Sequence, residues 1–110
     1  MGEVRRFGQV LGLRPEHRDA YIQHHASVWP EVLEIIHRHN IRNYSIFLHD
    51  DTLFAYLEYI GDDYAADMAA LGAEPKTQEW WALMEPMQDP LPTRAAGEWW
   101  ATMREVFHTD

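Results

Sequence analysis

The sequence predicts an α+β fold, and three observations lead to this prediction. Short segments rich in β-branched and aromatic residues alternate with segments whose apolar residues recur at helical spacing. Two strand-like segments, residues 43–49 and 52–59, flank the turn residues Asp50 and Asp51, which indicates a hairpin. The 110 residues contain no repeat, low-complexity tract or linker. We therefore expect a single α+β domain over residues 1–110.

The first part of the chain predicts a strand and then a helix. Residues 4–13 are apolar-rich and β-compatible, and Pro15 ends this strand while suiting the first turn of a helix. We expect the helix to run towards Trp29. Because Pro30 cannot continue the backbone hydrogen bonds, a kink or a fresh start is expected there, with Ser27 as a candidate cap.

The second strand of the hairpin is apolar on both sides. Leu53, Ala55 and Leu57 would point to one face of the sheet, and Phe54 and Tyr56 to the other. A sheet with one solvated face would not need both sets, so we expect both faces to be covered. One cover is the helical layer. The other is a ligand cavity, a partner subunit, or both.

The last part of the chain completes the order of elements. Residues 64–71 and 75–87 carry helical patterns, residues 89–92 form a proline-containing connection, and residues 98–108 fit either a strand or a helix. A final strand gives the order β-α-β-β-α-β, which is the split βαβ arrangement. We therefore predict a ferredoxin-like α+β fold.

Composition excludes several classes of partner and chemistry. The formal net charge is −9 and the nine Lys and Arg residues are scattered, so neither nucleic acid nor an anionic membrane surface is expected as a partner. No apolar run approaches the ~18 residues of a membrane span. The absence of cysteine excludes disulfides, thiolate metal sites and cysteine nucleophiles. It fits a reducing compartment and, as the chain starts without the apolar stretch of a signal peptide, we expect a cytoplasmic protein.

Aromatic and imidazole side chains form the candidate site. Tyr21, His25 and Trp29 recur every four residues, so a helix would stack a phenol, an imidazole and an indole on one face. Such groups, with the doublet of Trp80 and Trp81, suit a neutral, hydroxyl-rich small molecule such as a carbohydrate. The same spacing also fits an aromatic helix face that packs on the sheet. Adjacent tryptophans on a helix point about 100° apart, so one can enter the core while the other borders a cavity.

Other chemistries lack their motifs. His37 and His39 would face nearly opposite sides of a helix, and there is no HExxH, so we predict no metal site. The six glycines are dispersed and form no nucleotide-binding loop, and no GxSxG elbow is present. Proton transfer on a neutral ligand without a cofactor is the chemistry left.

Short motifs in a fixed order give the chain a family resemblance. They are Gln9-Val10, Tyr21-x-x-x-His25, Trp29-Pro30-Glu31, Asn43-Tyr44-Ser45-Ile46, Leu53-Phe54-Ala55, Trp80-Trp81-Ala82-Leu83-Met84 and Glu105-Val106-Phe107. Each is weak alone, but their order and spacing across nearly the whole chain resemble the L-rhamnose mutarotase family.

The resemblance implies a fold, an activity and a site. It implies a ferredoxin-like domain that pairs into a dimeric α+β barrel, and hence a homodimer. It also implies interconversion of the α and β anomers of L-rhamnose or a similar 6-deoxyhexose. At the matching positions, His25 would be the catalytic acid/base, and Tyr21, Tyr44, Trp80 and Trp81 would line the sugar site.

Two rival functions stay open at this point. One is a non-catalytic monosaccharide-binding or sensing domain on the same scaffold, because ferredoxin-like domains host many functions. The other is a cofactor-free or haem-handling monooxygenase, which uses similar dimeric barrels. Sugar binding without faster anomer exchange would favour the first, and haem colour or an oxidisable aromatic substrate the second.

Overall fold

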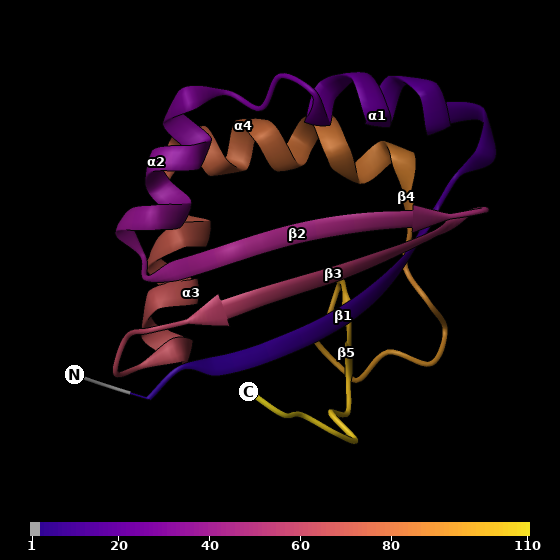
Figure 1. The fold of residues 1–110 in the computed structure, drawn as a ribbon. Helices are drawn as coiled ribbons and strands as arrows, with labels where there is room; N and C mark the ends of the chain where they lie inside the picture. Colours follow the sequence, from indigo (N-terminus) through magenta and orange to yellow (C-terminus); the bar gives the residue numbers. More distant parts are fainter. Residues whose placement is uncertain (1–2) are drawn as a thin grey trace.

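The structure, a computed structural model that describes residues 3–110, is built on a sheet that is antiparallel throughout. The strands lie in the order β2-β3-β1-β4, and the short β5 pairs with β1 along the same edge as β4. Figure 1 shows this sheet curling beneath a layer of helices. The strands are β1 (Arg5–Leu13), β2 (Ile41–His49), β3 (Thr52–Tyr59), β4 (Gln88–Asp89) and β5 (Ala101–Met103).

A pair of helices connects β1 to β2, and a second pair connects β3 to β4. In each pair, the second helix begins at a proline. Pro30 and Pro75 each occupy the first turn of the second helix of a pair, where a missing N–H costs no hydrogen bond. With both pairs in place, the predicted order β-α-β-β-α-β and the ferredoxin-like fold are confirmed. The helical elements are η1 (Pro15–His17), α1 (Arg18–His25), α2 (Pro30–Arg38), α3 (Tyr64–Ala73), α4 (Pro75–Met84) and η2 (Glu85–Met87).

The expected continuous helix towards Trp29 is wrong. Helix α1 ends at His25, and Trp29 has an extended backbone as the residue that precedes α2. The cause is Pro30, whose ring disfavours the helical conformation for the residue before it. The cap predicted at Ser27 is wrong for the same reason, because Trp29 occupies that position and makes no side-chain capping bond.

The predicted hairpin is confirmed and contains one irregularity. Strands β2 and β3 meet at Asp50 and Asp51, and Asp50 adopts a positive φ of 51°. The register of the pair shifts between Arg42 and Ser45. Such a bulge bends the strand and re-aims side chains. Here it turns Tyr44 to the face of the sheet that the helices cover, because its neighbour Ser45 pairs with Tyr56 on the opposite face.

The two faces of the sheet differ in their cover. Leu53, Ala55 and Leu57 are buried under the helices, as the alternation of β3 predicts. The cavity described below lies on this same face, so the expectation of a cavity against the opposite face is wrong. On that opposite face Phe47 is 64% exposed and Phe54 is also exposed. No segment within residues 3–110 covers them.

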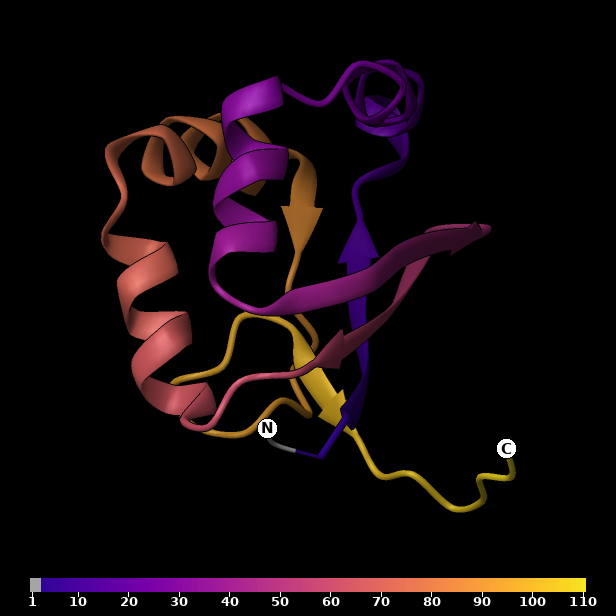
Figure 2. The ribbon, with the colours of Figure 1, turned by 60° about the vertical axis from the view of Figure 1, so that its left-hand side comes forward.

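The predicted final strand over residues 98–108 is shorter than expected. Only Ala101–Met103 pair with β1, and β4 adds a two-residue strand where a helix end and a connection were expected. Beyond β5 the chain leaves the sheet, and Figure 2 shows this C-terminal segment running away from the rest of the molecule. Val106 and Phe107 in it are 88% and 78% exposed. Within residues 3–110, no helix has the length and apolar character needed to cross a membrane.

Candidate active site

A cavity of about 500 Å³ lies between the helix-covered face of the sheet and helices α1 and α4. This volume is in the range of small-molecule sites. The structure brings all five site residues predicted from the sequence to this one cavity. They are Tyr21 and His25 from α1, Tyr44 from β2, and Trp80 and Trp81 from α4.

The tautomer of His25 follows from its backbone contact. The His25 Nδ1 atom lies 2.9 Å from the carbonyl oxygen of Tyr21, one helical turn earlier. A carbonyl only accepts, so Nδ1 carries the proton and donates it. The other ring nitrogen, Nε2, is then an unprotonated acceptor, and the His25 side chain lines the cavity. In its neutral form, His25 can therefore accept a hydrogen bond or a proton at Nε2.

Burial sets the charge state of the same ring. Desolvation lowers the pKa of His25 below its ordinary 6.5, and the neighbouring His24 lowers it slightly further, while the bond to the Tyr21 carbonyl opposes the shift. A neutral imidazole is thus the stable form at neutral pH.

Aromatic rings hold His25 on two sides. The Tyr21 ring stacks on the imidazole with 4.2 Å between centroids, and the edge of Trp80 meets it at 5.5 Å. Trp80 is itself packed by Trp29, whose ring centroid lies 5.0 Å away. Trp29 does not line the cavity, so its contribution is to fix Trp80 from behind.

The two adjacent tryptophans divide between core and cavity, as predicted from their 100° separation. Trp80 is 7% exposed and belongs to the same core cluster as Leu53 and Met84. Trp81 is 42% exposed, lines the cavity and packs near Gly72 of α3. The Trp80 indole therefore packs in the core beside the cavity. The Trp81 indole presents an accessible ring face.

Tyr21 and Tyr44 supply hydroxyl groups to the cavity. The Tyr44 side chain is 39% exposed, but desolvation of its hydroxyl group raises the pKa of Tyr44, and the nearby Tyr21 and Tyr64 phenols add to the effect. Burial likewise raises the pKa of Tyr21, partly offset by a hydrogen bond from Gln88. Both phenols consequently stay protonated and act as neutral hydrogen-bonding groups.

Several polar residues of the cavity were not predicted from the sequence. Gln9 lies on the inward face of β1 between the apolar Phe7 and Leu11, so a polar residue in an apolar alternation was the available signal. Thr77 also lines the cavity, and its buried hydroxyl has no hydrogen-bond partner within residues 3–110. Gln88 of β4 lines it as well and hydrogen-bonds to Tyr21. No local pattern marks Thr77 or Gln88.

Residues 90–100, which we call the strap, border the cavity with Trp99 and Trp100. Glu98 ties the strap to β5, because its carboxylate accepts hydrogen bonds from the Thr102 hydroxyl at 2.7 Å and from the Ala95 amide at 3.1 Å. These bonds lower the pKa of Glu98.

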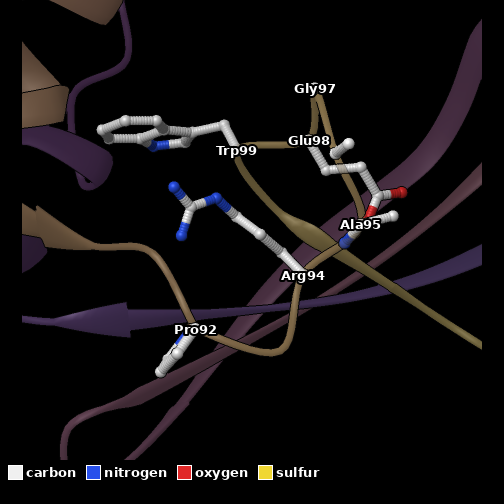
Figure 3. Close-up of a pocket in the computed structure, with 7 residues that line it drawn as sticks. Pro92, Arg94, Ala95, Gly97, Glu98 and Trp99 are labelled. Carbon is white, nitrogen blue, oxygen red and sulfur yellow. The ribbon is translucent and has the colours of Figure 1, made fainter.

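A second hollow of about 510 Å³ lies along the strap itself. Figure 3 shows Arg94 and Trp99 extending to one side of it, while the Glu98 carboxylate turns back toward Ala95. It is more open than the main cavity and holds none of the predicted site residues.

Fold and cavity together define a class of protein. A ferredoxin-like α+β domain holds a neutral imidazole beside phenols and indoles in a cavity whose volume, about 500 Å³, admits a small molecule. Within residues 3–110, no group of three or more His, Asp or Glu side chains is placed to hold a metal ion. The side chains present serve general acid–base chemistry on an uncharged, hydroxyl-bearing ligand.

Comparison with known proteins gives the family. The family model for L-rhamnose mutarotase matches residues 6–109, and the chain belongs to that family. It is 32% identical to the L-rhamnose mutarotase of Oceanobacillus iheyensis, covering 97% of this chain and 100% of the relative. It is 38% identical to that of Opitutus terrae, covering 82% and 84%. An L-rhamnose mutarotase crystal structure from Formosa agariphila has the same fold, with a TM-score of 0.75 at 24% identity over 96% of this chain and 99% of that one.

Proposed function

We propose that this protein is an isomerase that interconverts the α and β anomers of L-rhamnose or a similar 6-deoxyhexose. Membership of the L-rhamnose mutarotase family supports the substrate class. The observation that carries the chemistry is the convergence of the free His25 Nε2 with the Tyr21 and Tyr44 phenols on one cavity. A second function, a non-catalytic sugar sensor, would not need the fixed tautomer and neutral form of His25.

Mutarotation requires only proton transfers and rotation about one bond. Opening removes the proton of the anomeric hydroxyl, breaks the bond between C1 and the ring oxygen, and delivers a proton to that oxygen. Rotation about the C1–C2 bond exposes the other face of the aldehyde, and the reverse steps close the ring. We assign the proton exchange with the reacting oxygens to His25, because its imidazole lines the cavity and its lowered pKa keeps the ring neutral and able to accept a proton.

The remaining cavity residues position the sugar. Tyr21 and Tyr44 hold hydroxyl groups by hydrogen bonds, since their raised pKa values keep the phenols protonated. The accessible ring face of Trp81 packs against the C–H side of the pyranose and its methyl group. Trp80 closes the wall behind His25.

The function is tested by an anomer-exchange screen over a panel of aldoses. Saturation-transfer NMR should show enzyme-dependent exchange for L-rhamnose, weaker exchange for L-fucose, and the least for D-glucose, which lacks the methyl group. Binding of L-rhamnose with no acceleration of exchange would instead establish the sensor. No binding and no exchange with any aldose would reject both functions.

We also propose that a second copy of the chain covers the open face of the sheet and forms the dimeric α+β barrel. Phe47, Phe54 and Met103 are exposed on that face. Exposed aromatic patches of this kind commonly mark protein interfaces. Sedimentation equilibrium should give a dimer mass, and Phe54→Asp should give a monomer. Leu33→Asp, at an exposed position on α2, is the matched control and should leave the dimer intact.

Location and remaining partners stay predictions from the sequence. A cytoplasmic protein without nucleic-acid or membrane partners is expected from the scattered basic residues and the lack of cysteine.

A further inference from the structure

We propose that Trp99 and Gln88 are positioning residues that make Tyr21 a hydrogen-bond donor to the bound sugar. This inference rests on the proposed function, because its consequence is felt in anomer exchange. Trp99 comes from the strap, Gln88 from β4 and Tyr21 from α1. Their polar atoms form one chain from the strap to the cavity.

The chain consists of two hydrogen bonds. The Trp99 indole N–H donates to Gln88 Oε1 over 2.8 Å, and Gln88 Nε2 donates to the Tyr21 hydroxyl oxygen over 3.2 Å. Gln88 is 6% exposed and Tyr21 is also buried. Trp99 is 39% exposed. Water therefore competes little with the bond between Gln88 and Tyr21, and the buried amide of Gln88 depends on both of its partners.

The direction of both bonds is fixed by chemistry. An indole N–H can only donate, so it must meet the oxygen of the Gln88 amide and not its nitrogen. The NH₂ end of the same amide must then face Tyr21. A reversed amide would place two donors against each other at Trp99, and its oxygen would then accept the phenol hydrogen of Tyr21. Trp99 thus selects one of the two amide orientations.

The amide orientation in turn fixes the role of Tyr21. The NH₂ group of Gln88 donates to the Tyr21 hydroxyl oxygen and cannot accept a hydrogen bond in return. The O–H hydrogen of Tyr21 must therefore donate to another acceptor. No acceptor for this hydrogen is found in the part of the chain that the structure describes, and Tyr21 lines the cavity beside His25. The free donor is therefore available to an oxygen of the sugar. Trp99 and Gln88 act on the substrate only through this phenol.

Gln88→Glu tests the direction of the chain. A carboxylate accepts from Trp99 as the amide does, but it also accepts from Tyr21, so it draws the phenol hydrogen away from the sugar. We expect kcat/KM for L-rhamnose exchange to fall at least about tenfold at neutral pH. Gln78→Glu, an exposed change of the same kind on α4, is the matched control and should keep the parent value.

The Tyr21→Phe background separates positioning from a structural effect. If Gln88 acts through the phenol hydrogen, Gln88→Glu should cost less than about twofold once that hydrogen is gone, because residues that act as one unit are not additive. An equal loss in both backgrounds would overturn the proposal, and so would no loss in the parent background. The parent protein is assayed in parallel, so absence of exchange in the parent would reject the proposed function and not the hydrogen-bond chain.

Trp99→Phe provides a second, milder variant and a readout that needs no activity. It keeps an aromatic ring but removes the N–H that selects the amide orientation, so a severalfold loss of kcat/KM is expected, again absent in the Tyr21→Phe background. In an NMR spectrum of the parent protein, the indole N–H resonance of Trp99 is assigned as the one that is missing from the spectrum of Trp99→Phe. This resonance should shift in Gln88→Leu, which removes its acceptor. An unshifted indole resonance would overturn the chain whatever the activity.

Discussion

Replacing His25 with alanine should lower the enzyme-dependent exchange of L-rhamnose anomers by about 10²–10⁴-fold, the contribution of one positioned acid–base group. The reason is that this imidazole lines the cavity, carries an unprotonated Nε2 and is the group to which we assign the proton exchange. The measurement is saturation-transfer NMR at fixed enzyme and sugar concentrations. The matched control is His37→Ala, because His37 is exposed on α2 and does not line the cavity. An unchanged rate in His25→Ala would remove the acid–base role.

The pH dependence gives the same prediction a second readout. Burial lowers the pKa of His25, so the neutral base persists below pH 6.5 and the acidic limb of kcat/KM should lie below that value. The sign for stability is the same. As the pH falls, His25 is protonated at a higher pH in the unfolded chain than in the folded protein, because folding lowers its pKa. The stability linked to His25 is therefore present above about pH 6.5 and is lost as the pH falls through the folded pKa. His25→Ala should lack both effects.

Local periodicity predicted one pair of the site well and misread another. Tyr21 and His25 are four apart on a helix, and their rings stack as that spacing requires. Trp29 fits the same spacing but lies outside the helix, because Pro30 favours an extended backbone at the residue before it. Trp29 contacts Trp80 from this extended position. A spacing rule holds only while one regular element continues.

Helical and strand periodicity could not predict the cavity residues that lie on irregular segments of the backbone. Tyr44 faces the cavity because of a bulge in β2, and the family resemblance alone pointed to it. Gln88 and Tyr21 are 67 positions apart, and Trp99 lies on a strap without regular structure. Hydrogen bonds between such segments depend on tertiary packing, which leaves no period in the sequence.

The strand that is apolar on both sides predicted two covers but not their arrangement. Alternation in β3 correctly assigned Leu53, Ala55 and Leu57 to the helix-covered face. The cavity shares that face and lies between the sheet and the helices. The aromatic residues of the other face are exposed, and the dimer proposed above rests on Phe47 and Phe54 and not on the ligand site.

Trp80→Ala should lower the free energy of unfolding by about 3–5 kcal/mol, the usual cost of removing a large buried aromatic side chain. Trp80 is 7% exposed and packs against Trp29 at 5.0 Å and His25 at 5.5 Å. A loss of this size is a large part of the ~5–15 kcal/mol that stabilises a typical domain. Urea unfolding followed by circular dichroism measures it. Exchange activity should fall as well, because the imidazole loses one of the two rings that hold it.

Trp81→Ala is the matched comparison within the same doublet. Trp81 is 42% exposed and lines the cavity, so its removal should change the free energy of unfolding by no more than about 1 kcal/mol. The loss should appear instead as a raised KM for L-rhamnose, because an accessible ring face that packs on the sugar contributes to binding. Equal destabilisation by the two substitutions would contradict the division between a core indole and a binding indole. A normal KM in Trp81→Ala would place the sugar elsewhere in the cavity.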